Sequence, residues 1–203
     1  MPATAFAAHG IAAAGRSRRE LPLASLDLDG ALYLVYAGAI SRDCGIFEAV
    51  RGVRLALGEG VRARFAIAGS GPDEGELAEL VRSLDLGRAV SLAPAASGRD
   101  RLKLLSEAEV SVLPLAENGV PPALLDSLAA GVPVIAARTG AIADVLVEGV
   151  HGLFVKPHDA KDFCRAVRSL AADRALLGRM RSLCRRWWRP ADAPTLVMPT
   201  AFA

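Results

Sequence analysis

Polar residues in a loop, and in the helix predicted after it, have the clearest potential to bind a ligand. Within residues 114–136, a loop rich in Gly and Pro contains Asn118, Gly119 and Val120, and Asp126 lies in the first turns of the helix. A helix N-terminus carries about half a positive charge, and its backbone N–H groups attract anions. These residues therefore predict a phosphate-bearing ligand. An ordinary strand–helix–strand unit with a stiff loop is the plainer alternative.

A second candidate loop runs from Gly69 through Ser70 and Gly71 to Pro72, and Asp73 follows it. Glycines at the turn from a strand into a helix let backbone N–H groups approach an anion. A tight turn with a helix start explains the same residues, because proline and acidic side chains are favoured in a first helical turn. We favour this structural interpretation over direct ligand contact.

Acid–base and metal chemistry have little support. No histidine has a serine, cysteine or carboxylate at the spacing of a catalytic triad, and we interpret all three as surface or loop residues: His9, His151 and His158. Asp27 and Asp29 form one short acidic pair, which is poor evidence for a metal site. We therefore predict no metal and no cofactor.

Composition narrows the class of protein. The 24 basic and 22 acidic residues give a net charge of +2, which is too balanced to indicate a nucleic-acid partner. No run of about 18 apolar residues predicts a membrane span. The three cysteines, Cys44, Cys164 and Cys184, are widely spaced and form no metal or disulfide pattern, which is typical of a reduced, cytoplasmic location.

Short apolar runs alternate with helical periodicity along most of the chain. Strands are predicted at 31–38, 61–69, 89–93, 110–114, 132–137 and 152–155. Helices are predicted at 45–58, 73–86, 99–106, 122–130, 141–148, 159–171 and 174–188. This alternation forces parallel pairing through right-handed crossovers. It predicts an α/β fold with a doubly wound, Rossmann-like parallel sheet of about six strands. The domain spans 31–189, between an irregular lead-in at 1–30 and a disordered tail at 190–203.

A series of motifs between residues 32 and 172 resembles the C-terminal domain of retaining glycosyltransferases of family 4, the group 1 enzymes of the GT-B type. In chain order the motifs are Ala37-Gly38-Ala39 with Cys44-Gly45, Ala68-Gly69-Ser70-Gly71-Pro72, Val112-Leu113-Pro114, Asn118-Gly119-Val120 with Asp126 to Val134, and Thr139-Gly140-Ala141 with Asp144 and Glu148 to Val155. Each motif alone is a weak signal, whereas the ordered set is specific. The resemblance implies one half of a GT-B fold, which binds a nucleotide-diphosphate sugar as donor substrate.

The resemblance also implies roles for individual positions. The implied catalytic positions are Asn118, which would meet the sugar, and Asp126, which would bind the ribose. The implied donor-binding positions are Gly38, Arg42, Gly69, Gly71, Gly119, Val120 and Asp126. Arg42 enters this set as a partial substitute for cations that the family places nearby.

The charged positions of the family motifs are altered in this chain. Ala39 replaces an Arg, Cys44 replaces a Lys, Asn118 replaces one Glu and Asp126 replaces another. A charged hydrogen bond contributes about 1.5–3 kcal/mol, so the loss of both cations predicts donor binding that is weaker by orders of magnitude. The changes indicate relaxed function or an altered donor.

Two hypotheses remain open. In the first, the chain is the donor-binding domain of a retaining glycosyltransferase whose acceptor domain is absent, since only about 30 residues precede the first strand. Alone it would turn over slowly or not at all. In the second, it is a non-catalytic degenerate fragment, or a subunit that self-associates or pairs with a separate acceptor-domain protein. A dinucleotide-dependent oxidoreductase is disfavoured, because no G-x-G-x-x-G follows the first strand.

Overall fold

The structure of the chain is a computed structural model, which describes residues 30–95, 98–114 and 119–187. The predicted lead-in, apart from Gly30, and the predicted tail at 190–203 lie outside the described residues. Asn118, one of the two implied catalytic positions, lies outside them as well.

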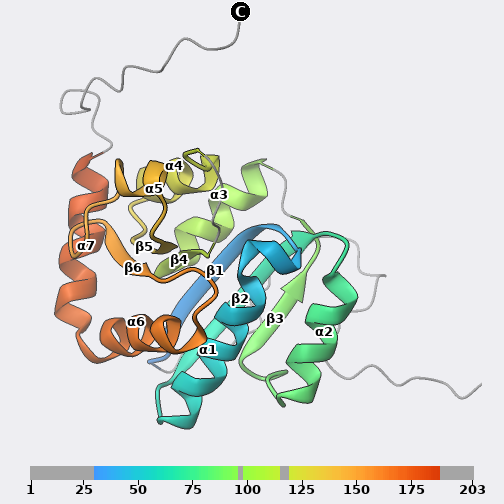
Figure 1. Cartoon of the computed structure of the whole chain (residues 1–203). Coiled ribbons are helices and arrows are strands. Elements are labelled where there is room, and N and C mark those ends of the chain that lie inside the picture. Colours follow the sequence, from blue (N-terminus) through green and yellow to red (C-terminus); the bar gives the residue numbers. More distant parts are fainter. Residues whose placement is uncertain (1–29, 96–97, 115–118, 188–203) are drawn as a thin grey trace, which may run out of the picture.

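The described chain forms one six-stranded sheet in which all paired strands run parallel (Figure 1). The strands are β1 (Leu32–Ala39), β2 (Ala63–Ser70), β3 (Val90–Ala93), β4 (Val110–Leu113), β5 (Val134–Ala137) and β6 (Gly152–Val155). Their order across the sheet is β3-β2-β1-β4-β5-β6. The predicted doubly wound α/β fold is therefore confirmed, including the number of strands.

The central strand β1 is apolar throughout because both faces of the sheet are covered. Leu34 and Tyr36 belong to the core cluster that also contains residues of the helices α1 (Ile46–Gly58) and α6 (Ala160–Ala172). Tyr33 and Val35, which alternate with them, belong to the cluster formed with α3 (Gly98–Glu107) on the opposite face. Successive strand residues point to opposite faces, so a strand buried on both sides has no polar face to show.

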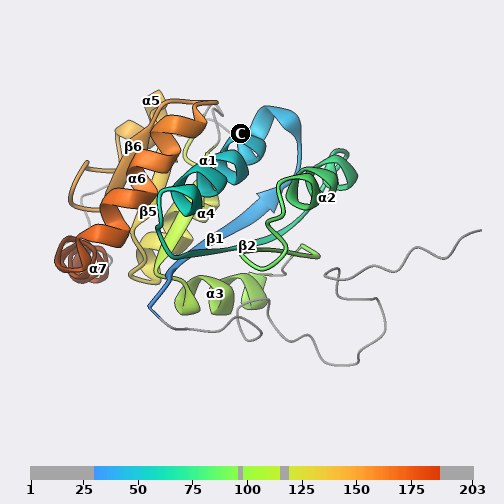
Figure 2. The same ribbon diagram turned by 90° about the horizontal axis from the view of Figure 1, so that it is seen from below.

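The helices cover the two faces in separate groups. The core on one face includes residues of α1, α6 and α2 (Glu74–Ser83), and the cores on the other include residues of α3, α4 (Pro122–Ala129) and α5 (Gly140–Ala143). Figure 2 shows α1 and α6 on one side of the sheet and α3 on the other. The last helix, α7 (Arg174–Trp187), adds Met180 to the first core and Cys184 to the opposite one. It contacts residues that precede β4, β5 and β6, and so lies along the amino-terminal ends of these strands.

A buried hydrogen bond fixes α4 to the sheet. The hydroxyls of Ser127 on α4 and Ser111 on β4 lie 2.8 Å apart, and the Ser127 hydroxyl lies 2.6 Å from the Ala123 carbonyl oxygen. Both serines are buried. Because a buried hydroxyl is costly unless it is hydrogen-bonded, this pair favours one position of α4 on the strand. Asp126 is the residue next to Ser127, so the pair also holds the helical turn that carries it.

The chain after α5 differs from the prediction. The expected helix at 141–148 ends at Ala143, because the following residues form turns that lead into β6. In these turns the Val147 N–H donates to His151 Nδ1 at 3.3 Å, and the Phe154 N–H donates to Glu148 at 2.8 Å. His151 lies in a turn, as its interpretation as a surface or loop residue allows, and its side chain is buried.

Candidate functional site

The order of the strands reverses at one point, between β1 and β4. From β1 the chain moves to β2 and β3 on one side, and it later returns to β4 on the other side of β1. The connections after β1 and β4 therefore cover opposite faces, and a crevice forms between them at the carboxyl ends of these strands. In doubly wound sheets this switch point is where ligands bind.

The segments after β1 and β4 touch at the switch point. Gly45, the residue before α1, has a φ of 72°, and a Cβ atom built there would lie 2.5 Å from the Pro114 carbonyl oxygen. A side chain would therefore be both strained and in collision with the backbone. Only glycine lets the start of α1 approach the end of β4 this closely, and the contact fixes the depth of the crevice.

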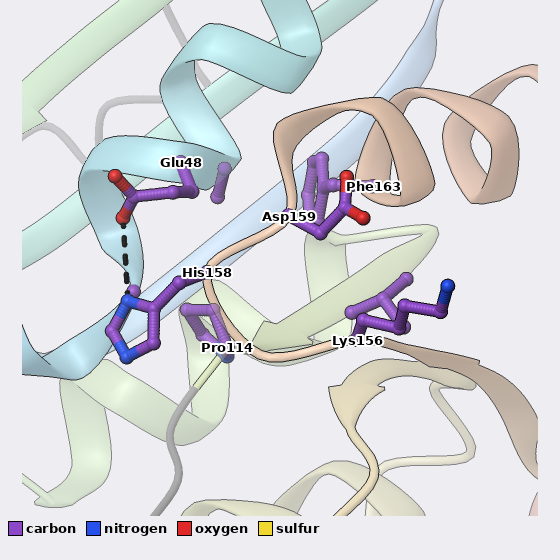
Figure 3. Close-up of a pocket in the computed structure, with 9 residues that line it drawn as sticks. Glu48, Pro114, Lys156, His158, Asp159 and Phe163 are labelled. Carbon is purple, nitrogen blue, oxygen red and sulfur yellow. Dashed lines mark ion pairs between the residues drawn. The ribbon is translucent and has the colours of Figure 1, made fainter.

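A small hollow at the switch point is lined by residues from the start of α1, the end of β4 and the segment that leads from β6 into α6 (Figure 3). Gly45 and Glu48 come from the start of α1, Pro114 from the end of β4, and Lys156 and His158 from the connection between β6 and α6. His158 Nδ1 lies 3.7 Å from the Glu48 carboxylate. The Lys156 side chain points away from that pair. The sequence analysis did not anticipate Lys156 or His158 at this site, since no motif marks their loop.

The glycines predicted to bind the donor lie at the carboxyl ends of β1 and β2. Gly38 and Gly69 are paired in register across the two strands. A Cβ atom at Gly69 would lie 2.2 Å from the Gly38 carbonyl oxygen, and one at Gly71 would lie 2.1 Å from the Ile40 carbonyl oxygen. Close approach of the backbone is enough to require glycine at Gly69 and Gly71. Their contact with a ligand stays a prediction.

Arg42 lies in a short 3-10 helix, η1 (Arg42–Cys44), which the sequence analysis did not predict. Its backbone N–H donates to Asp73 at 2.8 Å, its side chain forms an ion pair with Glu76 of α2, and its guanidinium lies 5.3 Å from the centre of the Phe47 ring. The Arg42 side chain is 63% exposed. An exposed ion pair contributes at most about 1 kcal/mol, so a phosphate can replace Glu76 at little cost.

The two positions that lost a cation supply no charge at the crevice. Cys44 is buried, and its thiol lies 3.0 Å from the carbonyl oxygen of Ser41, to which it donates. The carbonyl oxygen of Ala39 accepts a hydrogen bond from the Tyr36 hydroxyl at 2.5 Å. The substitution at Cys44 thus places an uncharged group inside the core.

Asp126 is already paired in this structure. Its Oδ2 atom lies 2.7 Å from Nη2 and 3.0 Å from Nε of Arg101, which lies on α3. Both side chains are about one third exposed or less. The sequence analysis missed Arg101, because an ion pair between two helices leaves no local pattern. Two further implied donor-binding positions, Gly119 and Val120, lie in the loop before α4. Gly119 has a φ of 122°, and Val120 is 37% exposed.

Two further features concern only the described part of the chain. No three His, Cys, Asp or Glu side chains gather there in a way that would hold a metal ion. No helix among these residues is both long and apolar enough to cross a membrane.

Several known proteins with similar sequences are named as glycosyltransferases. The family model described as "Glycosyl transferases group 1" matches residues 31–173. Glycogen synthase of Mycobacterium tuberculosis is 25% identical over 173 residues, which cover 85% of this chain and 42% of that protein. The chain spans less than half the length of the curated relatives that it matches.

Solved structures share the fold. The C-terminal domain of the group 1 glycosyl transferase LpcC from Francisella tularensis has a TM-score of 0.68 at 17% identity, covering 76% of this chain and 83% of that one. HepE from Anabaena, solved in complex with UDP-glucose, has a TM-score of 0.69 at 14% identity, covering 77% of this chain and 43% of that one. Since the family model matches most of the chain and the sheet has the architecture of these GT-B domains, the chain belongs to the group 1 glycosyltransferase family.

Proposed function

We propose that this chain binds a nucleotide-diphosphate sugar at the β1–β4 switch point and serves as the donor-binding unit in retaining glycosyl transfer. The observation that carries the proposal is the switch point itself, where the order of the strands reverses between β1 and β4 and the N-terminus of α1 lies against the end of β4. Membership of the family supports it, as do the complexes of HepE with UDP-glucose and of other neighbours with UDP.

The start of α1 is suited to the diphosphate. Gly45 is the N-cap residue of this 13-residue helix and supplies no side-chain hydrogen bond. The first N–H groups of a helix have no partner within it, and together with the helix dipole they favour an anion. In our proposal these groups and Arg42 take over part of the role of the family's cations, whose positions hold Ala39 and Cys44. Asp126 binds the ribose, and the resemblance to the family assigns the contact with the sugar to Asn118, which is outside the described residues.

Isothermal titration calorimetry of the chain with UDP, with GDP and with uridine tests donor binding. We expect a nucleoside diphosphate to bind with a dissociation constant near the millimolar range, because the two family cations are missing. Uridine should bind more weakly, because it lacks the diphosphate. The absence of measurable heat with UDP and GDP at millimolar ligand would contradict the proposal.

Transfer itself needs an acceptor held against the donor and water excluded from the cleft. We propose that a separate acceptor-binding unit supplies both, and that the chain as given turns over slowly or not at all. A second candidate, a non-catalytic module that pairs with an acceptor-domain protein or with itself, is favoured by the uncharged residues Ala39 and Cys44. Analytical ultracentrifugation measures the oligomeric state of the chain. If the chain sediments only as a monomer and also hydrolyses a nucleotide sugar, this second candidate is excluded.

A further inference from the structure

A second hollow lies at the carboxyl ends of the strands β5 and β6, and none of the implied donor-binding positions lines it. Its lining includes Arg138, which follows β5, and Phe154, Val155 and Lys156 at the end of β6. Val155 and Lys156 also line the hollow at the switch point, so the two hollows meet at these residues. A ligand at the switch point that extends toward β6 would therefore reach this second hollow.

Arg138 and Lys156 are the two cationic residues of the second hollow. Hydrogen bonds fix their backbones, whereas their charged groups form no ion pair among the described residues. The Arg138 N–H donates to the Val155 carbonyl oxygen at 3.0 Å, and the guanidinium lies 5.0 Å from the centre of the Phe154 ring. The Lys156 N–H donates to Asp162 at 2.8 Å. Within residues 30–95, 98–114 and 119–187, neither the Arg138 guanidinium nor the Lys156 ammonium forms an ion pair.

The acidic residues of the same hollow have other partners. Asp162 accepts the Lys156 N–H and pairs with Arg165 at 2.7 Å, and the Arg165 guanidinium lowers the pKa of the Asp162 carboxyl. Glu148 accepts the Phe154 N–H at 2.8 Å. The residues that line the hollow carry two positive and two negative charges, and Arg165, which lies outside the lining, adds a further positive charge beside Asp162. The charges of Arg138 and Lys156 are therefore opposed at the hollow by Glu148 alone.

We infer that this second hollow binds a phosphate-type anion through the Arg138 guanidinium and the Lys156 ammonium. The planar guanidinium donates to two oxygens of a phosphate at once, and stacking on Phe154 restricts its orientation in advance. The ammonium adds a point charge on a flexible side chain that is directed away from Glu48 and His158. The anion is either the diphosphate of the donor or a phosphate on a second ligand. The site itself does not depend on the proposed function, whereas its assignment to the donor does.

Calorimetry with inorganic pyrophosphate and with UDP tests this inference on the full chain. The test variant is Arg138→Gln with Lys156→Gln. The matched control, Arg54→Gln with Lys103→Gln, removes the same two charges from exposed positions on α1 and α3. We expect the chain to bind pyrophosphate, the test variant to bind it at least roughly tenfold more weakly, and the control to bind it unchanged. Should Arg138→Gln impair folding, Lys156→Gln alone serves as the test, since Lys156 is exposed.

The UDP titration identifies the source of the anion. Weaker UDP binding in the test variant assigns the hollow to the diphosphate of the donor. Unchanged UDP binding, together with lost pyrophosphate binding, assigns it to a second phosphate-bearing ligand. If UDP does not bind at all while the variant still loses pyrophosphate, the proposed function fails and the anion site stands. A chain that does not bind pyrophosphate, or a test variant that binds it as the control does, overturns the inference.

Discussion

At the scale of single residues, the ion pair between Asp126 and Arg101 changes how the predicted ribose contact should be understood. Two of the three guanidinium nitrogens of Arg101, Nε and Nη2, contact Oδ2 of Asp126, so in the proposed contact Oδ1 is the atom that meets a sugar hydroxyl. A carboxylate held in this way loses little rotational freedom when a ligand binds, which lowers the cost of association. In the proposed contact, Arg101 therefore fixes the orientation of the Asp126 carboxylate before a ligand binds.

Substitution of Asp126 tests this contact. We expect Asp126→Asn to weaken UDP binding about tenfold, because an amide keeps the shape but loses a charged hydrogen bond. The control is Glu107→Gln, which removes one negative charge from an exposed position on α3. Calorimetry on the two variants provides the comparison. Equal affinities would show that Asp126 does not contact the nucleotide.

Gly71 gives a second test at this scale, which concerns stability. A Cβ atom at Gly71 would collide with the backbone of Ile40, whereas one at Gly75 in α2 would meet no atom within 4 Å. We expect Gly71→Ala to destabilise the fold by about 1–3 kcal/mol, as overpacking does. Gly75→Ala should stabilise it by about 0.5–1 kcal/mol, because alanine suits a helix better. Urea unfolding measures both, and similar midpoints would refute the close backbone approach.

At the scale of elements, the turns between α5 and β6 form a compact unit around His151. Burial lowers the pKa of His151 below its usual value of 6.5. The folded chain thus favours neutral imidazole, which accepts the Val147 N–H. From about one pH unit above 6.5 upward, the imidazole is almost entirely neutral in both the folded and the unfolded state. As the pH falls below that value, the unfolded state binds the proton more readily, and the fold loses stability.

This linkage predicts a measurable pH dependence of stability. Between about pH 7.5 and about pH 5.5, the wild-type chain should lose more unfolding free energy than His151→Gln, whose side chain does not titrate. Urea titrations at both values supply the comparison. As a control, the difference between the two proteins should stay constant between about pH 7.5 and about pH 8.5, where His151 is neutral. An equal loss in both proteins at acid pH would show that His151 is not responsible.

The same element shows how far local sequence predicts structure. The strands and most helices were predicted closely. A strand that is buried on both faces is a continuous apolar run in the sequence, and an amphipathic helix repeats its apolar residues about every three to four positions. The helix at 141–148 was predicted too long, since its termination depends on bonds from Val147 and Phe154 to side chains in the following turns. The 3-10 helix at Arg42–Cys44 has no comparable period and was missed.

At the scale of the whole molecule, the candidate site was only partly predictable. The motifs located the loops after β1, β2 and β4, because glycines at strand ends are visible in sequence. The connection after β6, which contains Lys156 and His158, lies beside the loops after β1 and β4 because of the order of the strands in the sheet. No local pattern reveals which strand ends lie side by side. The contact between Gly45 and Pro114 likewise depends on residues far apart in the chain.

The central position of β1 also has a consequence for the synthesis of the chain. β1 is the first strand of the described chain, yet β4, one of its two neighbours, is formed from residues 110–113. Until the ribosome has synthesised β4, β1 can pair only with β2. The other edge of β1 then exposes unpaired N–H and C=O groups. Such edges are prone to pair with other chains. The interval between the emergence of β1 and that of β4 is therefore the period in which the nascent protein most needs protection by a chaperone.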